Sequence, residues 1–242
     1  MTTPVRGALA VAATLALILG FAAPAQAAPA QASPAQAATL TIPDTLPAIQ
    51  AAGARATGDR IAALNRTIRG LTRNDCISDG NQSQALGTLN GALAGMEELR
   101  DQIAAATDAS TAASLYRSVF EDWRVYAVSI PQSLYAASAD CLEETAIPAL
   151  LAAQSKLETA LAGPFADAVT PEIEADMAEL AAQIAVAQDS VTGAAAAALA
   201  VTPADYNANP AVLSDVKVDI TTATSAARLA RQAAQRVVEA LR

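Results

Sequence analysis

Most of the large aromatic side chains in this sequence lie in one stretch of twenty residues, Tyr116–Tyr135. This stretch holds five of the seven aromatic residues that follow position 27. In an alanine-rich chain these side chains are the largest anchors available, and aromatic burial dominates core energetics. Tyr116, Phe120 and Trp123 recur at helical spacing, which predicts that one face of a helix is bulky and lies in the core. Pro131 has no N–H and disfavours α geometry in the residue before it, so we expect the helix to end or bend there.

The first 27 residues have the pattern of a secretory signal peptide. Arg6 is their only charged side chain, an apolar run extends over residues 8–23, and Ala25-Gln26-Ala27 gives a small-x-small cleavage pattern. The apolar run is short for a transmembrane span, which needs about 20 residues. We therefore expect a secreted protein or one of the extracytoplasmic cell envelope, with no transmembrane segment in the mature chain. An uncleaved membrane anchor is the alternative.

Residues 28–44 continue a Pro-Ala-Gln-Ala repeat that begins at Pro24. Such a segment has little to bury, so we expect a disordered linker. Ala32 and Ala37 offer cleavage points besides Ala27. Cleavage after Ala27 would leave 215 of the 242 residues and shift the net charge from −9 to −10. That length is ample for a core, and an acidic chain is a poor nucleic-acid binder.

From residue 45 to residue 242 apolar side chains recur at helical spacing, without a convincing alternation of period two. We predict an all-α, elongated antiparallel bundle, either as one domain or as sub-bundles of residues 45–165 and 166–242. Helices are expected at 47–71, at 82–106, from 110, at 131–162 with a kink at Pro148, from 171 to about 198, and over the last 30 residues. The two C-terminal helices carry seams of coiled-coil type, joined by the link TPADYNANP at 202–210.

The two cysteines, Cys76 and Cys141, permit a single intramolecular pairing. An exported protein meets an oxidising environment, and an even count favours a disulfide. The bond would fasten the connection between the first two helices to the helix that begins near Pro131. Two free buried thiols are the alternative.

The sequence lacks histidine, which removes the commonest general base and the commonest metal ligand. With both cysteines in a disulfide no thiolate zinc site remains, so we expect no cofactor and no metal. The acids near the aromatic stretch are interpreted as a solvated face: Glu121, Asp122, Asp140, Glu143 and Glu144. A cofactorless helical enzyme of the chorismate mutase kind needs converging basic residues, and the middle of the chain offers few. We expect no enzymatic activity.

Two segments carry a resemblance to other proteins. Asp122-Trp-Arg-Val-Tyr126 with Ile130-Pro-Gln132, and TPADYNANP with the Val-Leu pair that follows it, resemble a group of uncharacterised secreted helical proteins of high-GC Gram-positive bacteria. The similarity covers roughly residues 110–140 and 199–242. It implies export and a helical fold, and it implies no activity and no binding residues.

Charge is distributed unevenly along the chain. Residues 82–199 hold sixteen acids and four bases, whereas residues 47–73 hold five arginines and one acid. At about 100° per residue, four of these arginines fall within an arc of about 60°, opposite the apolar seam of their helix. They are Arg55, Arg66, Arg69 and Arg73. The plain interpretation of this stripe is a solvated helix face with pairing to acidic neighbours, and the functional interpretation is a candidate site for an anionic partner.

Two functions stay open at this point. The first is a non-enzymatic protein of the cell envelope or extracellular space that acts by surface contact with an unknown protein, an anionic envelope polymer or a lipid headgroup. The second is a bundle that holds a small apolar ligand between helices near Trp123. A cavity beside Trp123 would favour ligand binding, and tight packing there would favour surface contact. A cofactorless enzyme ranks third.

Overall fold

The computed structural model describes residues 40–242, and the regular elements in that part of the chain are helices. The predicted signal peptide and most of the predicted linker lie outside the described residues. The elements are α2 (Leu46–Thr72), α3 (Asp79–Ala105), α4 (Ala109–Glu121), the π-helix η1 (Val125–Ser129), α5 (Ile130–Cys141), the π-helix η2 (Leu142–Ala146), α6 (Ile147–Ala162), the 3-10 helix η3 (Ala166–Ala168), α7 (Pro171–Val191), α8 (Ala194–Ala200), α9 (Pro203–Ala208) and α10 (Ser214–Ala240). The all-α prediction is confirmed, whereas the coiled-coil geometry stays a prediction.

The described residues form two compact units. Unit 2 comprises residues 40–141 and 193–218, and unit 1 comprises residues 142–192 and 219–242. One boundary between the units therefore follows Cys141, and another lies inside α10. The boundary between sub-bundles that the sequence suggested, near residue 165, is not among them. The division follows packing, because α8 and α9 lie against elements of the first half of the chain.

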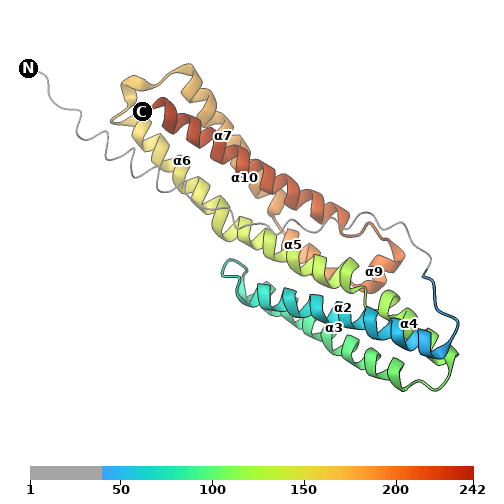
Figure 1. Cartoon of the computed structure of the whole chain (residues 1–242). Coiled ribbons are helices and arrows are strands. Elements are labelled where there is room, and N and C mark those ends of the chain that lie inside the picture. The colour runs from blue at the N-terminus through green and yellow to red at the C-terminus, as the bar shows by residue number, and fades with distance from the viewer. Residues whose placement is uncertain (1–39) are drawn as a thin grey trace, which may run out of the picture. The chain divides into compact units, whose positions relative to one another are not determined.

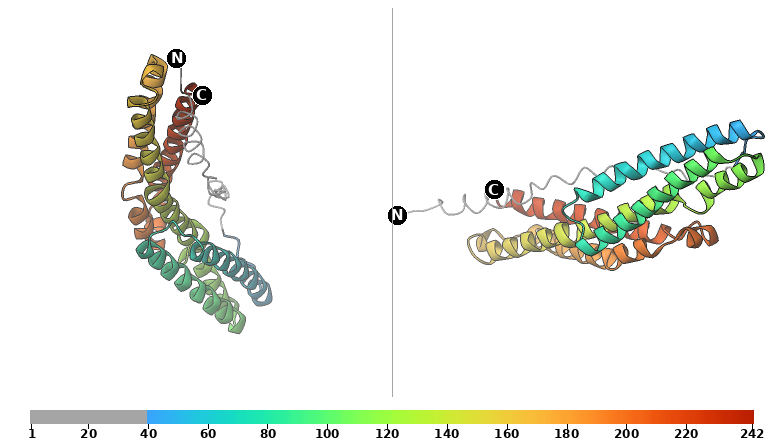
Figure 2. Two further views of the ribbon diagram at one scale, coloured as in Figure 1. Left: turned by 90° about the vertical axis from the view of Figure 1, so that its left-hand side faces the viewer. Right: turned by 90° about the horizontal axis from the view of Figure 1, so that it is seen from below.

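In unit 2, α2 and α3 form an antiparallel pair, and α4 packs against both (Figures 1 and 2). α5 packs against α3 and α8, while α9 packs against η1. Fully buried aliphatic side chains fill the centre of this unit: Ile49, Leu64, Leu89, Met96, Ile103, Val119, Val125 and Val128. Burial of a side chain of this size contributes roughly 1.5–3 kcal/mol, so this core holds the unit together.

The end of the predicted linker is ordered and belongs to unit 2. Leu40 and Ile42 pack against a cluster formed by Ile49, Ala112 and Tyr116. The prediction of disorder as far as residue 44 is wrong for these last residues. Leu40 and Ile42 are larger and more apolar than the Pro/Ala/Gln repeat before them, so they have surface to bury.

In unit 1, α6 and α7 pack together, and α10 lies beside α7 (Figure 1). Arg236 on α10 pairs with Asp176 at 2.7 Å and with Glu179 at 2.8 Å, and both acids belong to α7. The buried side chains include both branched aliphatic residues and alanines, among them Leu157, Leu180, Ile184, Ala223, Ala230, Ala234 and Val237. Small side chains let neighbouring helices approach closely.

Each of the two π-helices directly precedes an Ile-Pro pair. η1 ends before Ile130-Pro131, and η2 ends before Ile147-Pro148. Proline cannot donate to the carbonyl four residues earlier, and its ring crowds that carbonyl, so the preceding turn widens. A π-helical turn thus lies directly before the Ile147-Pro148 pair, where a kink was predicted.

Two predicted helices end earlier than expected. The aromatic helix ends at Glu121, before Pro131, because Arg124 adopts a left-handed conformation with φ 41°. The helix that begins at Pro171 was expected to reach residue 198, yet it ends at Val191. Gly193 has φ 75°, a conformation that glycine adopts without strain, and α8 begins after it.

Candidate functional site

The candidate site is the exposed side of α2 that carries the four predicted arginines, and we call it the arginine face. Arg55, Arg66, Arg69 and Arg73 are all solvent-exposed, the first three within α2 and the last at its C-cap. The opposite side of α2 buries Ile49, Leu64 and Leu71 in the core. The spacing of the residues predicted this arrangement. A helix has 3.6 residues per turn, and at that period the apolar and the charged residues of α2 fall on opposite faces.

The guanidinium groups of the arginine face are unpaired within the part of the chain that the structure describes. Within residues 40–242, none of its four guanidinium groups makes a hydrogen bond or an ion pair. Other basic residues do find partners: Arg100 pairs with Asp101 at 2.9 Å, and Arg236 pairs with two acids of α7. The pairing with acidic neighbours that the plain interpretation expected is therefore not formed.

Small residues lie before and between the arginines along the same face. Ala51, Gly58, Ala62 and Gly70 are exposed, and a Cβ at either glycine would meet nothing within 4 Å. Asp59 is the single acid on this face. The helix backbone is therefore accessible between long basic side chains, which lets a ligand chain approach α2 closely.

The fifth arginine of α2 points to a different side and has a different role. The guanidinium carbon of Arg60 lies 4.4 Å from the ring centroid of Phe120 and 5.0 Å from that of Tyr126. Its Nη1 donates to the carbonyl of Ala56 at 2.9 Å. Burial lowers the pKa of Arg60, but a guanidinium stays charged at neutral pH. The cation between two rings joins α2 to the aromatic stretch.

The three aromatic residues predicted for the core differ in burial. Tyr116 is buried, whereas Phe120 and Trp123 are half-buried. The rings of Tyr116 and Phe120 meet edge to face, with centroids 5.2 Å apart. Trp123 covers Gly95 of α3, where an added Cβ would overlap the indole ring. Trp123 is thus packed against backbone on one side and partly open on the other.

A junction between the turn at Arg124 and α9 was not predicted. Arg124 Nε donates to Asn207 Oδ1 at 2.6 Å, and Asn207 Nδ2 donates to the carbonyl of Glu121 at 2.8 Å. The Arg124 guanidinium also lies 5.3 Å from the ring centroid of Tyr206. These contacts hold α9 on the strained turn before η1. The segment around Arg124 and the segment around Asn207 each combine charged and aromatic residues. No other feature of the sequence indicated this junction.

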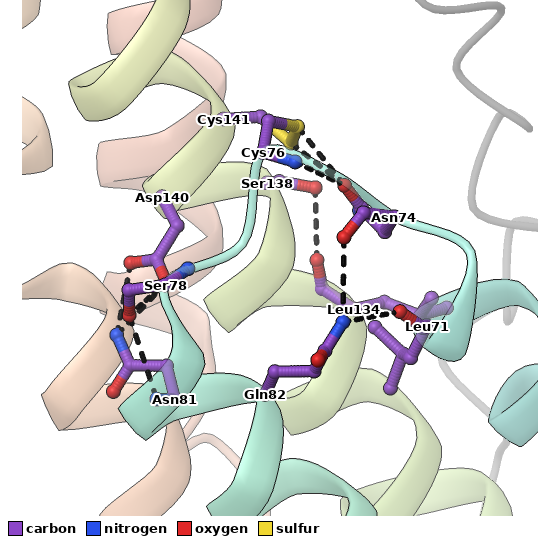
Figure 3. Close-up of a disulfide and its surroundings, with 10 residues drawn as sticks. All are labelled: Leu71, Asn74, Cys76, Ser78, Asn81, Gln82, Leu134, Ser138, Asp140 and Cys141. Atoms are coloured by element: carbon purple, nitrogen blue, oxygen red, sulfur yellow. Dashed lines mark hydrogen bonds between the residues drawn. A yellow bond between two sulfur atoms is a disulfide. The ribbon is translucent and has the colours of Figure 1, made fainter.

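The predicted disulfide between Cys76 and Cys141 is present, and a polar cluster centred on the buried Asp140 lies beside it (Figure 3). Asp140 is 4% exposed and accepts hydrogen bonds from the backbone N–H of Ser78, from its hydroxyl and from Asn81 Nδ2, all within 3.0 Å. Ser78 is the N-cap of α3, so the carboxylate lies where the helix dipole favours negative charge. The Asp140 carboxylate therefore has a structural role, in which it holds the start of α3 against α5.

The remaining acids that the sequence placed near the aromatic stretch do not converge on a site. Glu121, Asp122, Glu143 and Glu144 are exposed. Among residues 40–242 there is no group of three or more acids and cysteines placed to hold a metal ion. In the same part of the chain, no helix combines the length and the apolar character that crossing a membrane requires.

Comparison with protein-family models, with curated proteins and with solved structures found no match for this chain.

Proposed function

We propose that this chain is an exported, non-enzymatic protein of the cell envelope or extracellular space, and that its arginine face binds an anionic partner. The observation that carries the proposal is the set of four exposed arginines that have no partner among residues 40–242, on a chain of net charge −9. Unpaired arginines on a folded surface remain available to external oxyanions. A guanidinium donates in a planar fork that matches phosphate and carboxylate.

Two further observations support the proposal. The disulfide suits an oxidising compartment, which is the environment of exported proteins. Trp123 packs directly on Gly95, so the space that a small apolar ligand would need on that side of the ring is filled by α3. Of the two functions that the sequence left open, surface contact is therefore the better supported.

The test is a variant in which all four arginines of the arginine face are changed to glutamine. The control changes four exposed basic residues elsewhere to glutamine, and so alters the net charge equally: Arg117, Lys156, Arg228 and Arg242. Co-sedimentation with purified anionic wall polymer and with phosphatidylglycerol vesicles is measured at low and high salt. All substitutions are exposed, so circular dichroism and thermal stability should match the parent.

We expect the parent and the control to be retained at low salt and released at high salt, because exposed charges are screened beyond about 8 Å at physiological ionic strength. The arginine-face variant should lose retention. If it is retained as well as the parent, or if the parent is retained at no salt concentration, the proposal is wrong.

A further inference from the structure

The arrangement of the arginine face along α2 sets the length of ligand that could contact all of it. An α-helix rises 1.5 Å per residue, so Arg66, Arg69 and Arg73 occupy about 10 Å, and Arg55 lies about 16 Å before Arg66. The four arginines are therefore spaced over about 27 Å along one side of α2 and its C-cap. A single phosphate or a single headgroup reaches only a part of this line.

The side chains between the arginines argue against a lipid surface. Helices that lie in a membrane interface insert Trp, Phe or Leu side chains below their basic residues. The arginine face has Gly58, Asp59, Ala62 and Gly70 in those positions. Such a face offers charge and an accessible backbone, and it has no large apolar side chain to insert.

We propose that the arginine face binds an extended linear polyanion, laid along the axis of α2, in which Arg55 and the group Arg66, Arg69 and Arg73 contact separate oxyanions of the same ligand molecule. This inference rests on the proposed function and adds the shape of the partner. Its physical basis is multivalency: once one end of the chain is bound, the other end meets Arg55 at a high local concentration, so affinity rises without a new kind of contact.

The test uses polyphosphates of different length as probes, at equal total phosphate concentration and low salt. Orthophosphate and tripolyphosphate are too short to join Arg55 to Arg66, whereas long-chain polyphosphate spans the whole face. Binding is measured by isothermal titration calorimetry with the full mature chain. We expect long-chain polyphosphate to bind more than tenfold more tightly per phosphate than tripolyphosphate, in keeping with avidity gains of about 10²–10⁴ for linked sites.

Single variants make the test position-specific. Arg55→Gln should weaken the binding of long-chain polyphosphate and leave tripolyphosphate unaffected, because the short ligand occupies the group of three arginines. Arg69→Gln should weaken the binding of both ligands. Arg117→Gln, on the exposed side of α4, should weaken the binding of neither.

The outcomes separate this inference from the proposed function. If the parent binds no anionic probe, the proposed function fails and the inference fails with it. If the parent binds tripolyphosphate as tightly per phosphate as the long chain, or if Arg55→Gln weakens both equally, the arginine face still binds anions but the extended ligand is wrong. Tighter binding to phosphatidylglycerol vesicles than to long-chain polyphosphate also overturns it, in favour of a lipid surface.

Discussion

The indole ring of Trp123 lies against the backbone of Gly95, so closely that a methyl group on Gly95 would overlap it. Gly95→Ala should therefore displace the ring and destabilise the fold by about 2 kcal/mol, the middle of the range for overpacking. Trp123 is the single tryptophan of the chain, so its fluorescence reports the displacement directly. Urea unfolding followed by this fluorescence and by circular dichroism gives the free energy of unfolding.

The control for this prediction is Gly95→Ala in a variant that lacks the indole ring of Trp123. In a Trp123→Ala background, Gly95→Ala removes a glycine from a helix interior and should stabilise by roughly 0.5–1 kcal/mol. Gly95→Ala is thus expected to destabilise the protein when Trp123 is present and to stabilise it when Trp123 is replaced by alanine. Equal effects in both backgrounds would show that the two residues do not pack together.

Removal of the Cys76–Cys141 disulfide should destabilise unit 2. The bond closes a loop with a sequence separation of 65 residues, for which the chain-entropy model gives about 4 kcal/mol. The paired substitution Cys76→Ala with Cys141→Ala measures this without leaving a free thiol. Thiol labelling of the denatured, unreduced parent should find no reactive cysteine, and labelling of two would show that the bond does not form.

Asp140 should be essential for the connection between α2 and α3. Asp140→Ala removes the acceptor for three part-buried donors on Ser78 and Asn81, and the lost bonds to a charged group should cost about 3 kcal/mol. Asp140→Asn keeps the size and one acceptor oxygen, so a smaller loss is expected. Chemical denaturation of both variants measures the difference. Unchanged stability of Asp140→Ala would contradict a structural role for this carboxylate.

Sequence patterns predicted most of the helices, because amphipathic periodicity and local caps act over a few residues. The start of α7 at Thr170-Pro171 and the cap of α4 by Asp108 are examples of such local signals. The positions of the arginine face followed from the same periodicity. The disulfide was predictable because only one pairing existed.

Tertiary contacts decided the features that the sequence did not predict. The turn at Arg124 departs from the helical pattern, and it is held by Asn207, which lies 83 residues further along the chain. The cation between Phe120 and Tyr126 comes from Arg60 on another helix. Periodicity within one segment carries no information about such partners, so the aromatic stretch was predicted as core while its contacts to α2 and α9 were not.

The junction between Arg124 and Asn207 gives the last prediction, which concerns local stability. Asn207→Ala removes the acceptor for Arg124 Nε and the donor to the Glu121 carbonyl, so α9 should detach from η1. With only six residues, α9 depends on its capping box and on this docking. Amide hydrogen exchange should therefore become faster in residues 203–208 and 124–129, and the rate in α3 should not change.

Two further variants separate the contributions to this junction. Asn207→Asp keeps an acceptor for Arg124 and loses the donor to Glu121, so its exchange rates should lie between those of the parent and of Asn207→Ala. Arg124→Gly removes the hydrogen bond and the contact with Tyr206, but it relieves the left-handed backbone by roughly 1 kcal/mol. Global stability should thus change little in Arg124→Gly while α9 exchanges as fast as in Asn207→Ala. Parent-like exchange of α9 in both variants would mean that the link between α8 and α10 is held by other contacts.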